Sequence, residues 1–162
     1  MPPDAVSITM PGTRYLGIDY GTRRVGLAIS DPDGMIASPL LTLPWPGSAR
    51  KCAEAILAQV AQDYDVEEFV VGLPLYMHGG EGKQTEPVKK LAREIEEQSQ
   101  RPVHFWDERL TTRAAEVALN SAGLTRAKKK ARVDQVAAQI MLQSFLDCRR
   151  QESGSGPGAD SN

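Results

Sequence analysis

The stretch that most constrains the fold is a series of three apolar runs joined by very short turns. The runs cover residues 14–20, 24–30 and 35–43, and the turn signal DPDG separates the last two. Links this short join antiparallel strands, because a parallel connection needs a crossover of about a dozen residues or more. The sequence therefore predicts three consecutive antiparallel strands.

The rest of the chain alternates between helical and strand patterns. Strands are expected at 67–74 and 102–107, and helices at 48–62, 86–98, 111–123 and 129–149. Helical crossovers imply parallel strands. The predicted fold is therefore α/β, with a mixed five-stranded sheet of three antiparallel and then two parallel strands, flanked by helices. That order is the RNase H-like pattern.

The composition fits one soluble domain. The chain has 162 residues, of which 41% are hydrophobic and 25% charged. We expect an RNase H-like domain at 13–150, a flexible lead-in at 1–12 and a disordered tail at 151–162. Neither a membrane-spanning run nor a secretory signal is visible. The two cysteines, Cys52 and Cys148, form no disulfide or zinc pattern, so a cytoplasmic location is expected.

Asp19 stands inside the apolar run YLGIDYG, where a lone carboxylate is costly to ionise. One interpretation is local: Asp19 caps the following turn by accepting from the amide of Gly21 or Thr22. The other is that further carboxylates converge on it. The two are about equally plausible from the strand alone.

A second acidic position follows the strand at 102–107, which ends in Asp107, Glu108 and Arg109. Its carboxyl end should share one edge of the sheet with that of the first strand, and ligands favour this edge in open α/β sheets. Asp107 and Glu108 point to opposite faces of the strand. The alternative is a plain strand-to-helix turn, which suits Asp107 better than Glu108.

The third acid, Asp134, lies on the last predicted helix. At 100° per residue it falls within an apolar arc, between Met141 and Phe145. The arc is formed by Val133, Val136, Ala137, Ala138, Ile140, Met141, Leu142 and Phe145. A position in the first helical turn would favour the charge through the helix dipole, but it does not explain the direction of the side chain.

One hypothesis explains all three acids: they bind divalent metal. Mg²⁺ and Mn²⁺ prefer oxygen ligands. A pair of such ions about 3.5–4 Å apart activates water and stabilises the leaving oxygen of a phosphodiester. We therefore expect a two-metal site that cleaves nucleic acid.

Basic residues near these acids suit a polyanionic substrate, although such runs are often only solvated faces. The net charge is −2, but the charge is locally segregated. The expected nucleic-acid contacts are Arg23, Arg24, Lys83, Arg109, Arg113, Arg126, Lys128, Lys129, Lys130 and Arg132. His104 is expected to be a satisfied, half-buried residue, and Trp45 and Trp106 are either core or stacking residues.

Four segments in order resemble the YqgF/RuvX family of Holliday-junction-resolvase-like nucleases. They are YLGIDYGTRRVGLAISDPDGMIASPLLTL, VVGLPLYMHGGEGKQTEPVKKLA, WDERLTTRAAEVAL and KKKARVDQVAAQIMLQSFLD, which together cover about residues 14–148. The resemblance implies an RNase H-like endonuclease with Asp19, Glu108 and Asp134 as its acidic triad, and it favours Glu108 over Asp107. The LYMHGG loop departs from the family pattern.

The resemblance leaves the substrate open between the precursor of the small-subunit ribosomal RNA and four-way DNA junctions. Junction resolution needs two symmetric cuts and would imply a homodimer. Two other classes compete with a nuclease. One is an actin-like or sugar-kinase-like ATP-binding protein, which needs a second domain that this chain has no room for. The other is a non-catalytic nucleic-acid-binding factor, against which the three acids argue.

Overall fold

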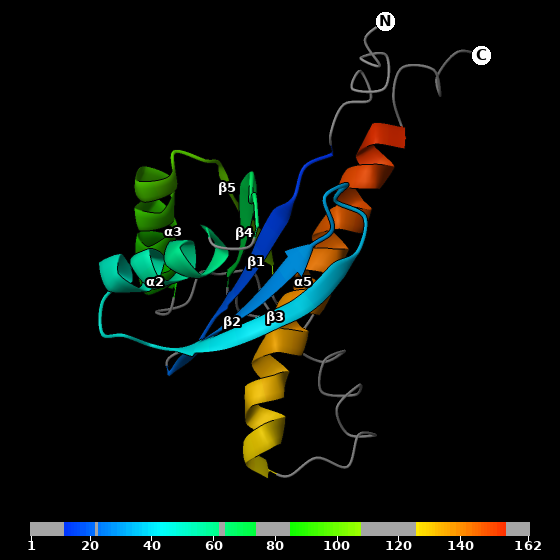
Figure 1. Ribbon diagram of the computed structural model, residues 1–162. Coiled ribbons are helices and arrows are strands. Elements are labelled where there is room, and N and C mark those ends of the chain that lie inside the picture. The colour runs from blue at the N-terminus through cyan, green and yellow to red at the C-terminus, as the bar shows by residue number, and fades with distance from the viewer. Residues whose placement is uncertain (1–11, 22, 62–63, 74–84, 108–125, 155–162) are drawn as a thin grey trace, which may run out of the picture.

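The computed structural model describes residues 12–21, 23–61, 64–73, 85–107 and 126–154, with side chains of the last helix described from 135 to 152. Five strands and three helices lie in this part of the chain (Figure 1). In order they are β1 (Tyr15–Tyr20), β2 (Arg24–Ser30), β3 (Ala37–Pro44), α2 (Ala49–Ala61), β4 (Glu68–Leu73), α3 (Thr85–Ser99), β5 (Val103–Asp107) and α5 (Arg126–Gly154). None of these helices is both long and apolar enough to cross a membrane.

The strands form one sheet in the order β3-β2-β1-β4-β5. β1 pairs antiparallel with β2, and β2 antiparallel with β3, whereas β1–β4 and β4–β5 are parallel. This confirms the predicted mixed sheet. Because β1, β4 and β5 run in the same direction, their carboxyl ends lie at one edge of the sheet, which we call the carboxyl edge. The opposite edge carries the turn between β2 and β3.

The strands begin and end within two residues of the predicted positions, but the last helix is longer than expected. α5 begins at Arg126 instead of about Lys129 and continues to Gly154 instead of ending at Arg149. The added residues include Arg, Ala, Lys, Gln and Glu, which all favour helix. The glycine-rich composition after Gln151 led the prediction to end the helix too early. The helix predicted at 111–123 lies outside the described residues.

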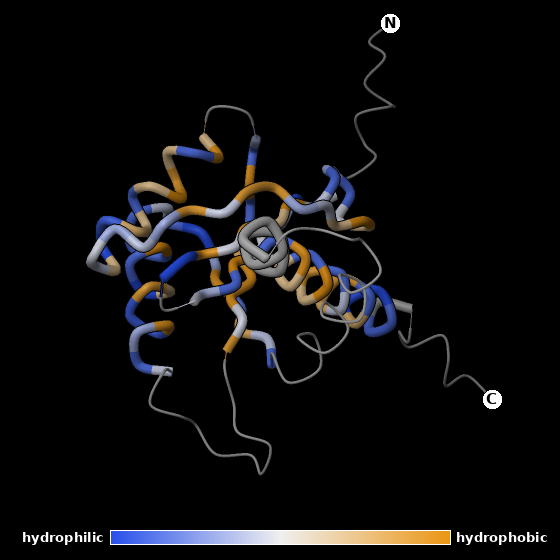
Figure 2. Tube along the Cα trace, turned by 90° about the horizontal axis from the view of Figure 1, so that it is seen from below, coloured by the Kyte–Doolittle hydropathy of each residue, from blue (hydrophilic) through white to orange (hydrophobic). Residues whose placement is uncertain are grey.

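The two faces of the sheet are covered by different helices. α2 and α3 pack together on one face, and α5 crosses the other (Figure 1). The first face has an aliphatic core between the strands and α2 and α3. Figure 2 shows apolar residues concentrated along the strands and the helix sides that face them. On α2, Ala53, Ile56 and Val60 are buried, whereas Ala61 is exposed.

The α5 face carries smaller residues, so the helix lies close to the sheet. A Cβ atom at Gly17 would stand 2.9 Å from Cβ of Leu142 and 3.3 Å from the Ala138 carbonyl oxygen. Such distances leave no room for a side chain at position 17. The helix surface that packs here includes Ala137, Ala138, Met141, Leu142, Phe145 and Leu146, which are all buried. The described part of the predicted apolar arc is therefore largely confirmed, with Val136 and Ile140 only half-buried, and the side chain of Val133 lies outside the described residues.

Hydrogen bonds hold α5 against the beginning of β3. The Gln143 side chain accepts from the Ala37 amide at 2.8 Å and donates to the Met35 carbonyl oxygen at 2.9 Å. Gln139 donates to the Ala37 carbonyl oxygen at 3.2 Å. These contacts fix the position of the helix along the sheet and hence the place of its amino-terminal half.

Candidate active site at the carboxyl edge

Asp19 lies near the end of β1 and is half-buried. Side chains alternate along a strand, so Asp19 shares its face with Gly17 and Tyr15. Gly17 packs against α5, and the Tyr15 ring meets the Phe145 ring of α5 at 5.4 Å between centroids. Asp19 therefore lies on the α5 face of the sheet.

The turn after Asp19 has its own backbone hydrogen bond. The Gly21 amide donates to the Arg24 carbonyl oxygen at 2.8 Å, and a Cβ at position 21 would stand 2.7 Å from that oxygen. The glycine is needed because the two backbone segments approach so closely. The Gly21 amide thus has a partner other than Asp19, so the local explanation of this carboxylate is left with the amide of Thr22. Thr22 lies outside the described residues.

Glycines flank Asp19 in the sheet. Gly26 of β2 is paired directly with Asp19. On the other side, Gly17 pairs with Val70 and Ile18 with Val71, so the next step of the parallel ladder brings Gly72 beside Asp19. Neither neighbour carries a side chain that would cover the carboxylate. Gly26 and Gly72 were not among the predicted site residues, although a glycine inside a strand pattern is a known sign of close approach.

The register of α5 on β1 places the helix position of Asp134 toward this carboxylate. Phe145 packs on Tyr15, and Leu142 and Ala138 pack on Gly17, so the helix runs antiparallel to β1. The four residues of helix from Ala138 back to Asp134 span about 6 Å. The two residues of strand from Gly17 to Asp19 span about 6.6 Å, so the two backbone positions are offset from the Gly17 contact by similar lengths. The backbone of Asp134 is part of α5, but its side chain lies outside the described residues.

β5 shows on which face of the sheet Asp107 lies. Phe105 lines a cavity with Lys89 and Ala92 of α3, whereas Trp106 packs on Phe145 of α5 at 6.0 Å between ring centroids. Asp107 has the strand parity of Phe105 and so lies on the α3 face, opposite to Asp19. Glu108, the next residue, lies outside the described part of the chain.

The structure describes only some of the predicted nucleic-acid contacts. Arg23 is exposed and Arg24 half-buried, both at the carboxyl edge beside the β1–β2 turn. The helical backbone of α5 includes the basic residues of its first turns, but their side chains are not described; they are Arg126, Lys128, Lys129, Lys130 and Arg132. The other three contacts lie outside the described residues, namely Lys83, Arg109 and Arg113. Within the described side chains, no group of three His, Cys, Asp or Glu residues is placed to hold a metal ion.

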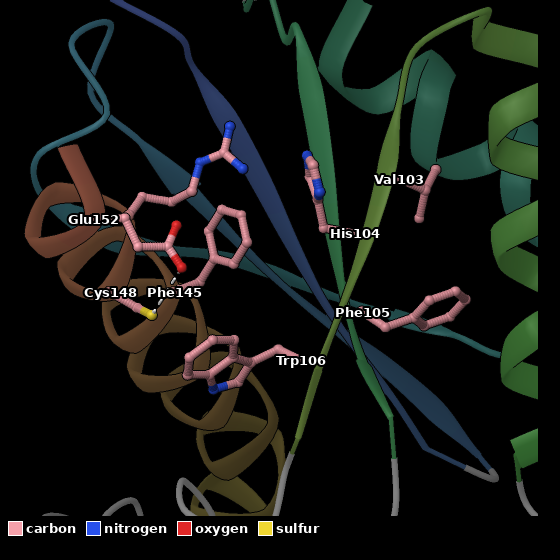
Figure 3. Close-up of a pocket in the computed structure, with 8 residues that line it drawn as sticks. Val103, His104, Phe105, Trp106, Phe145, Cys148 and Glu152 are labelled. Atoms are coloured by element: carbon pink, nitrogen blue, oxygen red, sulfur yellow. Dashed lines mark hydrogen bonds between the residues drawn. The ribbon is translucent and has the colours of Figure 1, made fainter. Parts of the chain in front are cut away.

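A cavity of about 410 Å³ lies away from Asp19. It is bounded by β5 and the carboxyl-terminal half of α5 (Figure 3). His104, at its wall, lies 2.5 Å from Glu68 through Nε2 and Oε1, and Arg149 lies 3.9 Å from the same oxygen. His104 is thus satisfied and half-buried, as expected. None of the predicted site residues is among the described residues that line this cavity.

The two tryptophans occupy different environments. Trp106 packs against the aromatic residues of the α5 face. Trp45 is half-buried at the carboxyl edge, where its ring meets that of Tyr20 edge-on at 5.2 Å between centroids. Burial raises the pKa of Tyr20, and the nearby Cys52 raises it further, so its phenol is neutral at physiological pH.

Comparison with known proteins agrees with this architecture. Residues 13–148 match the family model described as RuvX: Holliday junction resolvase. A Chloroflexus aurantiacus protein with the name "Putative pre-16S rRNA nuclease" is 46% identical over 83% of this chain and 87% of its own length. A Syntrophus aciditrophicus protein with the same name is 40% identical over 92% of this chain and 98% of its own.

Among solved structures, Thermus thermophilus RuvC in complex with a Holliday junction substrate has a similar fold. The TM-score is 0.52 and the identity 17%, over 86% of this chain and 96% of RuvC. This likeness confirms the RNase H-like fold. Fold, family match and relatives together support the predicted hydrolase function, that of an endonuclease. The chain therefore belongs to the RuvX family of Holliday junction resolvases.

Proposed function

We propose that this chain is a metal-dependent nuclease that cleaves phosphodiester bonds in structured nucleic acid at the carboxyl edge of its sheet. The observation that carries the proposal is the setting of Asp19. This carboxylate lies between two glycines on the face covered by α5. From its contact with Gly17, the α5 backbone leads back to Asp134 alongside the strand residues that lead on to Asp19. A half-buried carboxylate whose neighbouring strand residues carry no side chain is suited to a cation and an anionic substrate.

The residues proposed to hold the metal are Asp19, Glu108 and Asp134. All three offer carboxylate oxygens, the donors that Mg²⁺ and Mn²⁺ prefer, so the donor set fits these ions. When bound, a pair of such ions supplies an activated water and charge stabilisation for the leaving oxygen. Asp107 has the wrong strand parity for this site, which supports Glu108 as the second acid.

The protein's own groups would orient the substrate. Arg23 and Arg24 lie at the same edge as Asp19, and the basic first turns of α5 belong to the helix that carries Asp134. Phosphate contacts from arginine and lysine position a nucleic acid without reading its sequence. We expect the remaining predicted contacts, Arg109, Arg113 and Lys83, to act in the same way.

The first substrate to test is the precursor of 16S ribosomal RNA, because relatives at 40–46% identity over most of the chain carry that name. This role would place the protein in the cytoplasm. Four-way DNA junctions are the second candidate, favoured by the description of the family. Symmetric junction cutting would require a homodimer, because one site makes one cut.

The test is cleavage of both substrates in Mg²⁺ and in Mn²⁺ by the wild type and by an Asp19→Asn variant. We expect the variant to lose activity by on the order of 10³-fold, since metal-based stabilisation contributes several kcal/mol to the barrier. Asp33→Asn is the matched control, because this exposed aspartate lies at the opposite edge of the sheet, and it should cut normally.

Other outcomes separate the competing functions. Binding of either substrate without cleavage in both metals would contradict the nuclease and favour a non-catalytic binding factor. Cleavage that persists in Asp19→Asn would place the chemistry at another site. Tight binding of ATP would favour the kinase-like alternative.

A further inference from the structure

An aromatic pair, Tyr20 and Trp45, lies directly beside the candidate active site. Tyr20 follows Asp19 in β1, and their Cα atoms are therefore about 3.8 Å apart. Pro44 ends β3 opposite Arg24, so the next residue, Trp45, lies at the same carboxyl edge. The two rings meet edge-on with centroids 5.2 Å apart.

The backbone fixes this pair next to basic residues. The Trp45 amide donates to the Arg23 carbonyl oxygen at 2.9 Å, which ties the tryptophan to the β1–β2 turn. Arg23 itself is exposed, and Arg24 is half-buried in the same turn. Aromatic rings and cations are therefore held together within one short stretch of the edge.

Neither ring is fully buried. Tyr20 and Trp45 pack against the core on the α2/α3 face but remain partly exposed. Beyond Trp45 the turn is exposed at Pro46 and Gly47, and no atom lies within 4 Å of where a Cβ on Gly47 would stand. Trp106 is also half-buried, but it packs against Phe145 on the α5 face, and its Nε1 atom is buried with no hydrogen-bond partner among the described residues. Of the two tryptophans, Trp45 is the one held beside the exposed Arg23.

Bases of single-stranded nucleic acid stack on such rings while arginines contact the phosphates. In a duplex the bases are already stacked on each other and present no free face.

We propose that Trp45, supported by Tyr20 and with Arg23 beside it, is a stacking platform for an unpaired nucleotide next to the cleavage position. This inference rests on the proposed nuclease function and adds to it a substrate feature: an unpaired strand flanking the scissile bond. The platform lies on the α2 side of the carboxyl edge, and Asp19 lies on the α5 side.

The test uses the two tryptophans as matched reporters. In an Asp19→Asn/Trp106→Phe protein Trp45 is the sole tryptophan, and in an Asp19→Asn/Trp45→Phe protein it is Trp106. Each is titrated with an oligouridylate single strand and with an RNA duplex of equal length, in EDTA. We expect the single strand to quench Trp45 emission and leave Trp106 emission unchanged, and the duplex to have a much smaller effect on Trp45.

A separate binding measurement keeps the two proposals distinguishable. Anisotropy of a fluorescein-labelled single strand reports binding without tryptophan. Replacing Trp45 with leucine should weaken this binding by about tenfold, whereas Trp45→Phe should restore most of it. Thermal melting checks that both variants are folded.

If the strand binds but Trp45 emission does not change, the stacking platform is contradicted and the nuclease proposal stands. The same holds if single strand and duplex quench Trp45 equally, because the ring would then not be reading an unpaired base. If no nucleic acid of any form binds, the proposed function fails and this inference fails with it.

Discussion

On the α2/α3 face, the sheet presents large aliphatic side chains such as Leu16, Ile18 and Leu27, which fill a thick core under two helices. On the α5 face, the same strands present Gly17 and Ala28, and one helix lies almost directly on the backbone. The first arrangement holds its helices through side chains. The second fixes one helix in place, and it is that helix which carries Asp134.

We infer from this difference that the two faces of the sheet have different roles. Packing on the α2/α3 side supplies most of the buried aliphatic surface and so contributes to stability through the hydrophobic effect. Packing on the α5 side also sets the register of the helix against Asp19. Changes on the two faces should therefore affect stability and activity in different proportions.

The largest expected effect comes from a matched pair of leucine truncations. Leu142 on α5 and Leu91 on α3 are both fully buried. Replacing either by alanine should lower the free energy of unfolding by about 2–5 kcal/mol. Only Leu142→Ala should also reduce cleavage per folded molecule, because it loosens the helix that carries Asp134. Denaturant unfolding and activity assays measure the two quantities. Equal activity losses in both variants would contradict different roles for the two faces.

A smaller effect is expected when a methyl group is added under α5. In Gly17→Ala the new Cβ would stand 2.9 Å from Cβ of Leu142, so the helix must move away. Overpacking of this kind costs about 1–3 kcal/mol of stability, and it should lower activity as well. Gly34→Ala is the control, because its Cβ would stand 2.7 Å from the Thr13 carbonyl oxygen at the other edge of the sheet. It should destabilise the protein without changing activity per folded molecule.

The smallest effect concerns pH and the β2–β3 turn. Burial raises the pKa of Asp31, but hydrogen bonds from backbone amides, including those of Ile36 and Met35, outweigh it, so the net pKa lies below 3.8. A carboxyl group whose pKa is lowered in the folded state stabilises the protein above its unfolded pKa, and this stability is lost as the pH falls through the folded pKa.

We therefore expect Asp31→Ala to lower the free energy of unfolding near neutral pH by less than about 1 kcal/mol, since the group is solvent-screened. The difference from wild type should shrink as the pH falls below about 4. Melting curves across this range test it. A difference that grows toward low pH would contradict the assigned hydrogen bonds.

Much of the fold was predictable because its signals are local. Two short turns determine the three antiparallel strands, and apolar periodicity locates α2, α3 and α5. Strand alternation also predicted that Asp107 and Glu108 face opposite sides. It did not show which face of β5 is the one that α5 covers. That depends on contacts such as those of Trp106 with Phe145 and of Phe105 with α3.

Other features of the site depended on pairing between distant strands. The glycines beside Asp19 come from β2 and β4, and their alignment follows from the sheet register rather than from sequence spacing. The same is true of Trp45, which reaches the carboxyl edge only because β3 ends opposite Arg24. The sequence left its role open between core and stacking.

Mn²⁺ binding to the wild type and to single carboxylate variants, measured calorimetrically, tests the central claim most directly. Asp19→Asn, Glu108→Gln and Asp134→Asn should each lose binding, whereas Asp107→Asn should bind as the wild type does, because Asp107 lies on the opposite face of β5. Wild-type affinity in any of the first three variants, or loss of binding in Asp107→Asn, would contradict a metal site built from Asp19, Glu108 and Asp134.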